Sequence, residues 1–290
     1  MTPKAGRYVA GAATGLAIAL SLTACKGASQ DKASGGEPTS GAAHLTAAQN
    51  VLAKVSERTS GVTSYRGTMS VAMSASGQQV DFKGNMACRL KPSKAMKLVM
   101  TMRGIGQGTA RVTEIVTGDK LYMKMPALQA RTGKPWVGIK RSDLHKESGA
   151  DLQSMQQSDQ GDPALNTKLL TASKDVRQIG RETVGGVRTT HYKGTYSMTD
   201  AMSKLSGDQR AQAQKSFAEA GFDKINFDMW VDGRQLPRRV TIATPSDAQV
   251  GMKMTLNYTA FNVPVSVTVP PKSQVADGAG LLGGGQNVPS

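Results

Sequence analysis

Apolar and polar residues alternate along most of the chain, and this two-residue period predicts β-strands. The alternation is clearest at Ile225, Phe227, Met229 and Val231, which share one face of a predicted strand. Further alternating runs lie around residues 69–74, 79–90, 96–102, 109–117, 120–125, 136–140, 175–183, 187–197, 236–242 and 250–258. The links between these runs are short, which favours antiparallel pairing. We therefore predict a single sheet of roughly ten or eleven strands.

Three segments have a helical pattern instead. The first has capping-box spacing at 46–49 and ends before Gly61. The second lies within 142–173, where Asp162 precedes a proline suited to the first turn of a helix. The third runs from 199 to 220. Because so large a sheet must curl, these patterns predict an α+β fold: a large curled antiparallel sheet, or incomplete β-barrel, with helices covering its concave face.

Three local signals refine the predicted sheet. Gly185-Gly186 and Asp232-Gly233 are typical of β-hairpin turns. Pro237 predicts a bulge or an edge strand, because proline cannot donate a hydrogen bond to a neighbouring strand. Gly84 interrupts an alternating run and predicts a bend.

The N-terminus has the pattern of a bacterial lipoprotein signal. Lys4 and Arg7 precede an uncharged apolar stretch at 9–22, which is too short to span a bilayer comfortably. The stretch ends in Leu22-Thr23-Ala24-Cys25, which resembles a lipobox. We predict a signal peptide at 1–24 and a lipid on the thiol of Cys25. The alternative is an ordinary signal peptide followed by a chance cysteine.

The remaining domain boundaries follow from composition. Residues 25–44 are rich in Gly, Ser and Ala and predict a flexible tether. Residues 45–272 contain the predicted helices and strands and form the folded domain. Residues 273–290 are Gly-rich and are predicted to be a disordered tail.

Cysteine content and charge narrow the function further. Cys25 and Cys88 are the only cysteines, so lipidation of Cys25 leaves Cys88 without a disulfide partner. Cys88 shares an apolar strand face with Phe82 and Met86, which predicts a buried, unreactive thiol. The net charge is +15, and loss of Lys4 and Arg7 with the signal leaves about +13. Secretion argues against a nucleic-acid partner, and a basic surface beside anionic lipid headgroups or an anionic cell wall is the better interpretation.

Signals for catalysis are weak. The histidines His44, His145 and His191 lack the spacing of a zinc-protease pair. Ser29-Gln30-Asp31-Lys32 fits an S-x-x-K pattern but lies in the predicted tether. The glycines between Gly104 and Gly108 are better explained by a hairpin loop than by a phosphate-binding loop. We predict no catalytic residue, no metal site and no cofactor.

Methionine is the more informative residue. The chain has 15 Met but only 5 Phe and 2 Trp, and many of the methionines occupy apolar strand faces. Flexible methionine side chains suit a surface that adapts to irregular apolar partners, although they also fill ordinary cores. If the sheet curls around a cavity, strand parity predicts that these residues line it: Val71, Met73, Phe82, Met86, Met100, Ile225, Phe227, Met229, Met252 and Met254.

The C-terminal strands carry a family resemblance. Trp230-Val231-Asp232-Gly233, Leu236-Pro237, Tyr258–Asn262 and the segment Pro264–Pro271 resemble the actinobacterial LppX/LprG-type lipoproteins, whose fold is related to that of LolA and LolB. The order of predicted helices and strands agrees with that family across most of residues 47–271. The segment between 142 and 173 is longer than the resemblance implies. The resemblance implies an open, incomplete barrel with a hydrophobic cavity for acyl chains, and it carries over no catalytic residues.

These observations together predict a lipoprotein anchored to the outer face of the cytoplasmic membrane that binds or carries an acylated lipid or glycolipid. The alternative is an envelope regulatory module that binds another protein through the same half-barrel fold. A third hypothesis is that the protein is an enzyme. The sequence names neither the ligand nor a protein partner.

Overall fold

The computed structural model describes residues 40–75, 77–104, 108–140, 143, 162–205, 210, 223–248 and 250–278. All of these residues belong to one compact unit, Thr39–Ser290. The unit contains every described strand and helix, so we expect it to fold without residues 1–38. The predicted signal peptide, Cys25 and most of the predicted tether lie outside the described residues.

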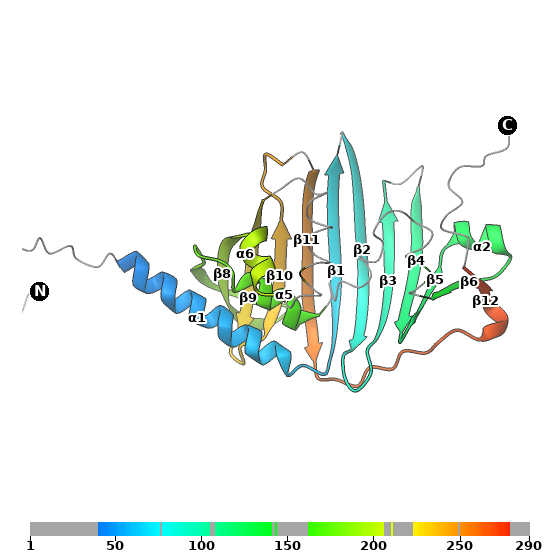
Figure 1. Cartoon of the computed structure of the whole chain (residues 1–290), viewed down its shortest axis with the longest axis horizontal. Helices are drawn as coiled ribbons and strands as arrows, with labels where there is room; N and C mark the ends of the chain where they lie inside the picture. The colour runs from blue at the N-terminus through cyan, green and yellow to red at the C-terminus, as the bar shows by residue number, and fades with distance from the viewer. Residues whose placement is uncertain are drawn as a thin grey trace, which may run out of the picture. The chain divides into compact units, whose positions relative to one another are not determined.

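One 12-stranded sheet dominates the unit (Figure 1). Its strands are β1 (Ser64–Ala75), β2 (Gln78–Arg89), β3 (Ala95–Arg103), β4 (Thr109–Thr117), β5 (Lys120–Lys124), β6 (Trp136–Lys140), β7 (Arg177–Val184), β8 (Val187–Ser197), β9 (Lys224–Asp232), β10 (Pro237–Ala243), β11 (Val250–Phe261) and β12 (Val275–Asp277). The spatial order is β12-β6-β5-β4-β3-β2-β1-β11-β10-β9-β8-β7, which leaves β12 and β7 as edges of a sheet that is not closed.

The predicted strand pattern and the large α+β sheet are confirmed, with one difference in pairing. Every described pair is antiparallel except β12 and β6, which run parallel, so the sheet is mixed. The parallel strand lies within 273–290, the segment predicted to be a disordered tail. The short, weakly apolar run at Val275–Asp277 gives no clear alternation, and its pairing depends on a neighbour that is distant in sequence.

Four helices are described, and they agree in part with the prediction. They are α1 (Ser40–Ser60), α2 (Pro126–Thr132), α5 (Pro163–Leu170) and α6 (Met198–Ser203). The predicted start of α5 is confirmed, because the carboxylate of Asp162 accepts a hydrogen bond from the backbone N–H of Ala164 at 2.9 Å. Residues 142 and 144–161 of the second predicted segment lie outside the described residues, as do residues 206–209 and 211–220 of the third.

The start of one helix differs from the prediction, and one short helix was not predicted. α1 begins at Ser40, so Thr46 lies inside the helix rather than at its cap, and the predicted tether is shorter. α2 was not predicted, although Pro126 at its first turn and Gly133 in the left-handed conformation after it (φ 67°) are ordinary helix boundary signals. Its seven residues are too few to show a clear helical period.

The predicted turns are present. Gly185 and Gly186 have φ of 56° and 78° in the β7–β8 hairpin, a conformation that glycine adopts without steric cost. The carboxylate of Asp232 accepts hydrogen bonds from the backbone of Arg234 and Leu236, and thereby shapes the β9–β10 turn. The register shifts just after Pro237, so the predicted bulge is confirmed on a central strand.

The main core lies between the sheet and three helices. Leu52 and Val55 of α1, Leu170 of α5 and Ala201 of α6 belong to one buried cluster with apolar residues of β1, β2, β3, β8, β9, β10 and β11. Figure 1 shows α1, α5 and α6 on the β8–β10 side of the sheet. A smaller cluster joins β5, β6 and α2 through Leu121, Leu128, Val137 and Ile139.

The predicted burial of Cys88 is confirmed. Its residue is 3% exposed and lies directly opposite the buried Tyr65 in the β1–β2 register. Burial raises the pKa of the Cys88 thiol to about 11, because the thiolate loses hydration in the apolar core.

We predict that native Cys88 resists alkylation. The chain from Lys26 onward contains Cys88 as its only thiol, so a water-soluble maleimide reports on it alone. At pH 8 the labelling rate should be at least about a hundredfold below that of an ordinary exposed thiol, because both thiolate fraction and access are reduced. Ser74→Cys with Cys88→Ser places a thiol at an exposed position of β1 and is the matched control. Equal labelling rates for the two proteins would contradict the prediction.

Candidate functional site

The sheet places all ten predicted cavity residues on one face. Val71 lies directly opposite Phe82 on β2 and opposite Met254 on β11, and directly paired residues project to the same side. Met254 in turn lies opposite Ile242 on β10, which lies opposite Phe227 on β9. The same parity relates the other predicted residues, so one apolar face extends across the sheet.

Part of this face is closed by packing. Met86, Ile225, Phe227 and Met229 are 7%, 2%, 1% and 0% exposed and belong to the main core with residues of α1, α5 and α6. Their surroundings are a packed core rather than open space. The expectation that Met229 lines a cavity therefore does not agree with its complete burial.

The other six predicted residues remain partly exposed. Met73 is 37% exposed, and the others have intermediate exposure: Val71, Phe82, Met100, Met252 and Met254. Met73 lies opposite Met252, and Val71 lies opposite both Phe82 and Met254, so the residues form adjoining cross-strand rows. We call these six residues the open apolar strip. It covers part of β1, β2, β3 and β11, and whether it contacts a ligand stays a prediction.

Two cavities lined by described residues lie elsewhere. One of about 480 Å³ is lined at the ends of β7, β8 and β9 by residues that include Arg181, Glu182 and Arg188. The other, of about 450 Å³, is lined by β5, β6, β12 and residues near Val269. Neither cavity is lined by any of the ten predicted residues.

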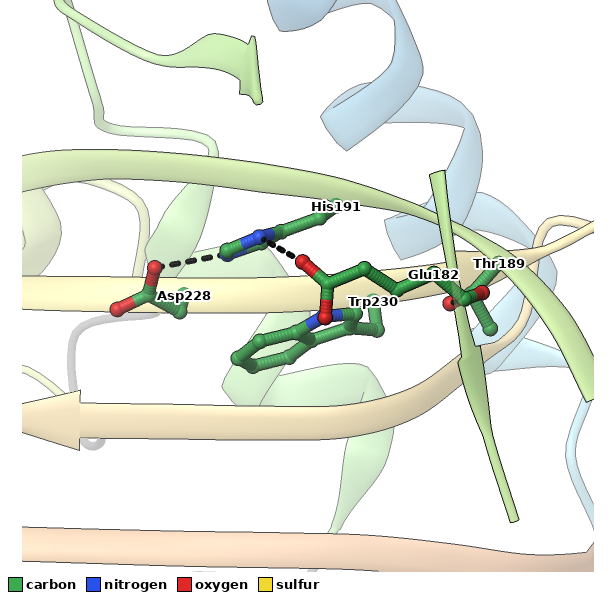
Figure 2. A network of polar contacts seen from close by, with 5 residues as sticks. All are labelled: Glu182, Thr189, His191, Asp228 and Trp230. Atoms are coloured by element: carbon green, nitrogen blue, oxygen red, sulfur yellow. Dashed lines mark hydrogen bonds and ion pairs between the residues drawn. The ribbon is translucent and has the colours of Figure 1, made fainter. Parts of the chain in front are cut away.

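The opposite face of the sheet carries a polar network that sequence reasoning missed (Figure 2). His191 of β8 contacts two carboxylates: its Nδ1 is 2.9 Å from Glu182 Oε1, and its Nε2 is 2.8 Å from Asp228 Oδ1. The indole N–H of Trp230 donates to Glu182 Oε2 at 2.9 Å, and the Trp230 ring stacks on His191 with centroids 4.2 Å apart. The guanidinium of Arg239 lies 5.4 Å from the Trp230 ring on the same face.

This network joins neighbouring strands. The hydrogen bond from Trp230, together with His191, lowers the pKa of the Glu182 carboxyl. Both ring nitrogens of His191 contact carboxylate oxygens, so the imidazole is held between Glu182 and Asp228. The contacts link β7, β8 and β9 on the face away from the main core.

The other residues considered for chemistry give no site in the described part of the chain. Gly104 and Gly108 lie in the link between β3 and β4, whose ends pair at Arg103 and Thr109, so the predicted hairpin is confirmed. His145 and the segment 29–32 lie outside the described residues, as does the side chain of His44. Among the described residues, no cluster of His, Cys, Asp and Glu has a metal-binding arrangement, and no helix there is long and apolar enough to cross a membrane.

Comparisons with known proteins agree with this architecture. No family model matches the chain. The chain is 32% identical over 178 residues to an uncharacterized 31.2 kDa protein of Streptomyces griseus, a match that covers 59% of this chain and 58% of the relative. It is 28% identical over 186 residues to a putative lipoprotein of Streptomyces coelicolor, covering 63% of this chain and 56% of the relative. The chain therefore matches little more than half the length of either relative.

Solved structures define the fold class. LprF from Mycobacterium bovis matches with a TM-score of 0.50 at 14% identity, over 78% of this chain and 97% of that one. The lipoprotein LppX of Mycobacterium tuberculosis gives a TM-score of 0.48 at 19% identity, over 77% and 99%. The chain thus has an LprF-like fold, an open sheet with helices packed on one face. The predicted resemblance to LppX/LprG-type lipoproteins is confirmed at the level of the fold.

Because Met229 is packed in the main core and Met100 is partly exposed, we predict that the same Met→Trp substitution affects stability differently at the two positions. Met229→Trp should lower the free energy of unfolding by about 1–3 kcal/mol, because the fully buried site has no room for an indole ring. Met100→Trp should change it by less than about 1 kcal/mol, because that side chain is partly exposed. Urea unfolding of both variants measures the difference, and equal losses would show that Met100 is packed as tightly as Met229.

Proposed function

We propose that the chain is a lipid-anchored envelope protein that binds the acyl chain of a lipid against the open apolar strip. The single observation that carries this proposal is the partial exposure of six adjoining apolar side chains on a face whose other half is closely packed. Contiguous exposed apolar surface is uncommon on soluble domains and usually marks a binding surface. The strip is rich in methionine, which adapts to an irregular hydrocarbon surface.

The size of the hydrophobic effect supports an acyl ligand. Burying a CH₂ group contributes about 0.8 kcal/mol, so even part of a long acyl chain gives substantial binding free energy. The same contact removes the strip residues from water, which stabilises the protein side as well. No catalytic group is needed for this function, and we propose a binding or carrier protein rather than an enzyme.

An N-terminal lipid would bring this surface close to its ligands. The lipobox ending at Cys25 supports anchoring at the outer face of the cytoplasmic membrane, and the name of the Streptomyces coelicolor relative, a putative lipoprotein, supports the same assignment. The basic mature chain would also be attracted to anionic headgroups there. Binding and anchoring together suit a protein that takes an acylated lipid or glycolipid from the membrane or returns one to it.

Lipid binding can be tested on the chain from Lys26 onward, which retains the whole compact unit. We expect native mass spectrometry to detect co-purified acyl lipid. Met100→Trp should weaken binding of a fluorescent acyl probe about tenfold, because the indole occupies the strip. Val99→Trp, one residue away on the opposite face of β3, is the matched control and should bind normally. If the purified protein contains no lipid, does not bind the probe and binds a protein partner, the result would instead favour a regulatory module.

Anchoring has a separate test. We predict that Cys25→Ser prevents incorporation of labelled fatty acid and releases the protein from the membrane fraction, because a basic patch alone binds membranes far less tightly than a multiply acylated N-terminus. Cys88→Ser is the control and should incorporate label normally. Continued labelling of the Cys25→Ser protein would show that the lipobox interpretation is wrong.

A further inference from the structure

One carboxyl group lies on the apolar face of the sheet. Glu114 is in the middle of β4, directly opposite Leu98 on β3 and Met123 on β5. Along its own strand, the residues that share its face are Val112 and Val116. The register thus surrounds Glu114 with apolar side chains in all four directions. The sequence alone did not reveal this, because β4 taken by itself reads as a mixture of polar and apolar residues.

Glu114 lies where the two hydrophobic clusters meet. On one side, Leu98 belongs to the main core, and Met100 of the open apolar strip packs against that core. On the other side, Val116 and Met123 pack against the smaller cluster of β5, β6 and α2. A chain molecule lying on the strip and extending toward β5 would pass over Glu114.

The carboxyl is unusual in its environment. Within the described part of the chain, neither a hydrogen bond nor an ion pair engages Glu114, and its residue keeps intermediate exposure. Burial raises the pKa of this carboxyl, since the carboxylate form loses hydration beside apolar side chains. A polar group held in such a place without a partner is costly to stability, which favours a role in binding.

We propose that Glu114 forms a hydrogen bond with a free hydroxyl group of the bound lipid, and so selects hydroxyl-bearing acyl lipids over fully esterified ones. This inference rests on the proposed function, because it needs an acyl ligand on the same face. A carboxylate accepts a hydrogen bond from a hydroxyl, and a protonated carboxyl both donates and accepts one, so the two groups are complementary in either form. An ester without a hydroxyl would leave Glu114 unpaired beneath the ligand.

The test compares two ligands with the same acyl chain. The chain from Lys26 onward is loaded with a fluorescent acyl probe, which is displaced by 1-monopalmitoylglycerol or by methyl palmitate. We expect the native protein to prefer the glycerol ester about tenfold, the size of one buried hydrogen bond. Glu114→Met, which matches the neighbouring side chains in length, should remove the preference and bind methyl palmitate at least as well. Glu114→Gln keeps a donor and an acceptor and should retain part of the preference.

Two controls separate selectivity from folding. Thr113→Leu changes the adjacent position on the opposite face of β4 and should keep the full preference. Any general loss of folding lowers both affinities and leaves their ratio unchanged, and the thermal midpoint of Glu114→Met should equal or exceed that of the native protein. An equal ratio in native protein and Glu114→Met, or no preference in the native protein, overturns the role of Glu114 while the proposed function stands. Failure of the native protein to bind the probe at all overturns both.

Discussion

The rest of the structure depends on the pairing register of β1 with its two neighbours. β1 pairs along its length with β2 on one side and β11 on the other, and these pairings set which side chains face the helices. A slip by one residue would turn every apolar side chain of β1 toward the polar face. The alternation of Met69, Val71 and Met73 with Ser70, Ala72 and Ser74 strongly favours the observed register.

Once the register is set, the helices cover the apolar face unequally, and the proposed function rests on this difference. α1, α5 and α6 pack on the side of β8, β9 and β10, where Phe227 and Met229 are completely buried. Toward β1, β2 and β3 several apolar side chains keep some exposure, so the same alternation that buries one half of the face leaves the open apolar strip on the other. Proteins with this LprF-like fold retain it at 14% identity, because the fold needs the alternation and the turns rather than particular residues. Function then depends on what covers the open part of the face.

The carboxylates on the described strands follow the same division, except for Glu114. His191, Glu182 and Asp228 form their network on the face away from the main core, where charged groups can remain hydrated (Figure 2). Glu114 is on the apolar face instead, where a carboxyl has no stabilising role in the packing that the structure describes. Places where a sequence departs from its own pattern are often functional sites, and this is the physical reason for connecting Glu114 with ligand binding.

The sequence by itself determined the strands other than β12, most of the turns, the capped start of α5 and the burial of Cys88. These features are local, because side-chain alternation, glycine conformation and helix capping involve residues close together in the chain. The tertiary structure decided what depends on distant segments: the parallel pairing of β12 with β6, and the separation of packed Met229 from partly exposed Met100. The alternation along each strand places both methionines on the same face of the sheet. Which of them is covered depends on where helices distant in sequence pack. The position of Glu114 between two hydrophobic clusters likewise required the register of three strands, since a single strand shows the face of a residue but not its neighbours across the sheet.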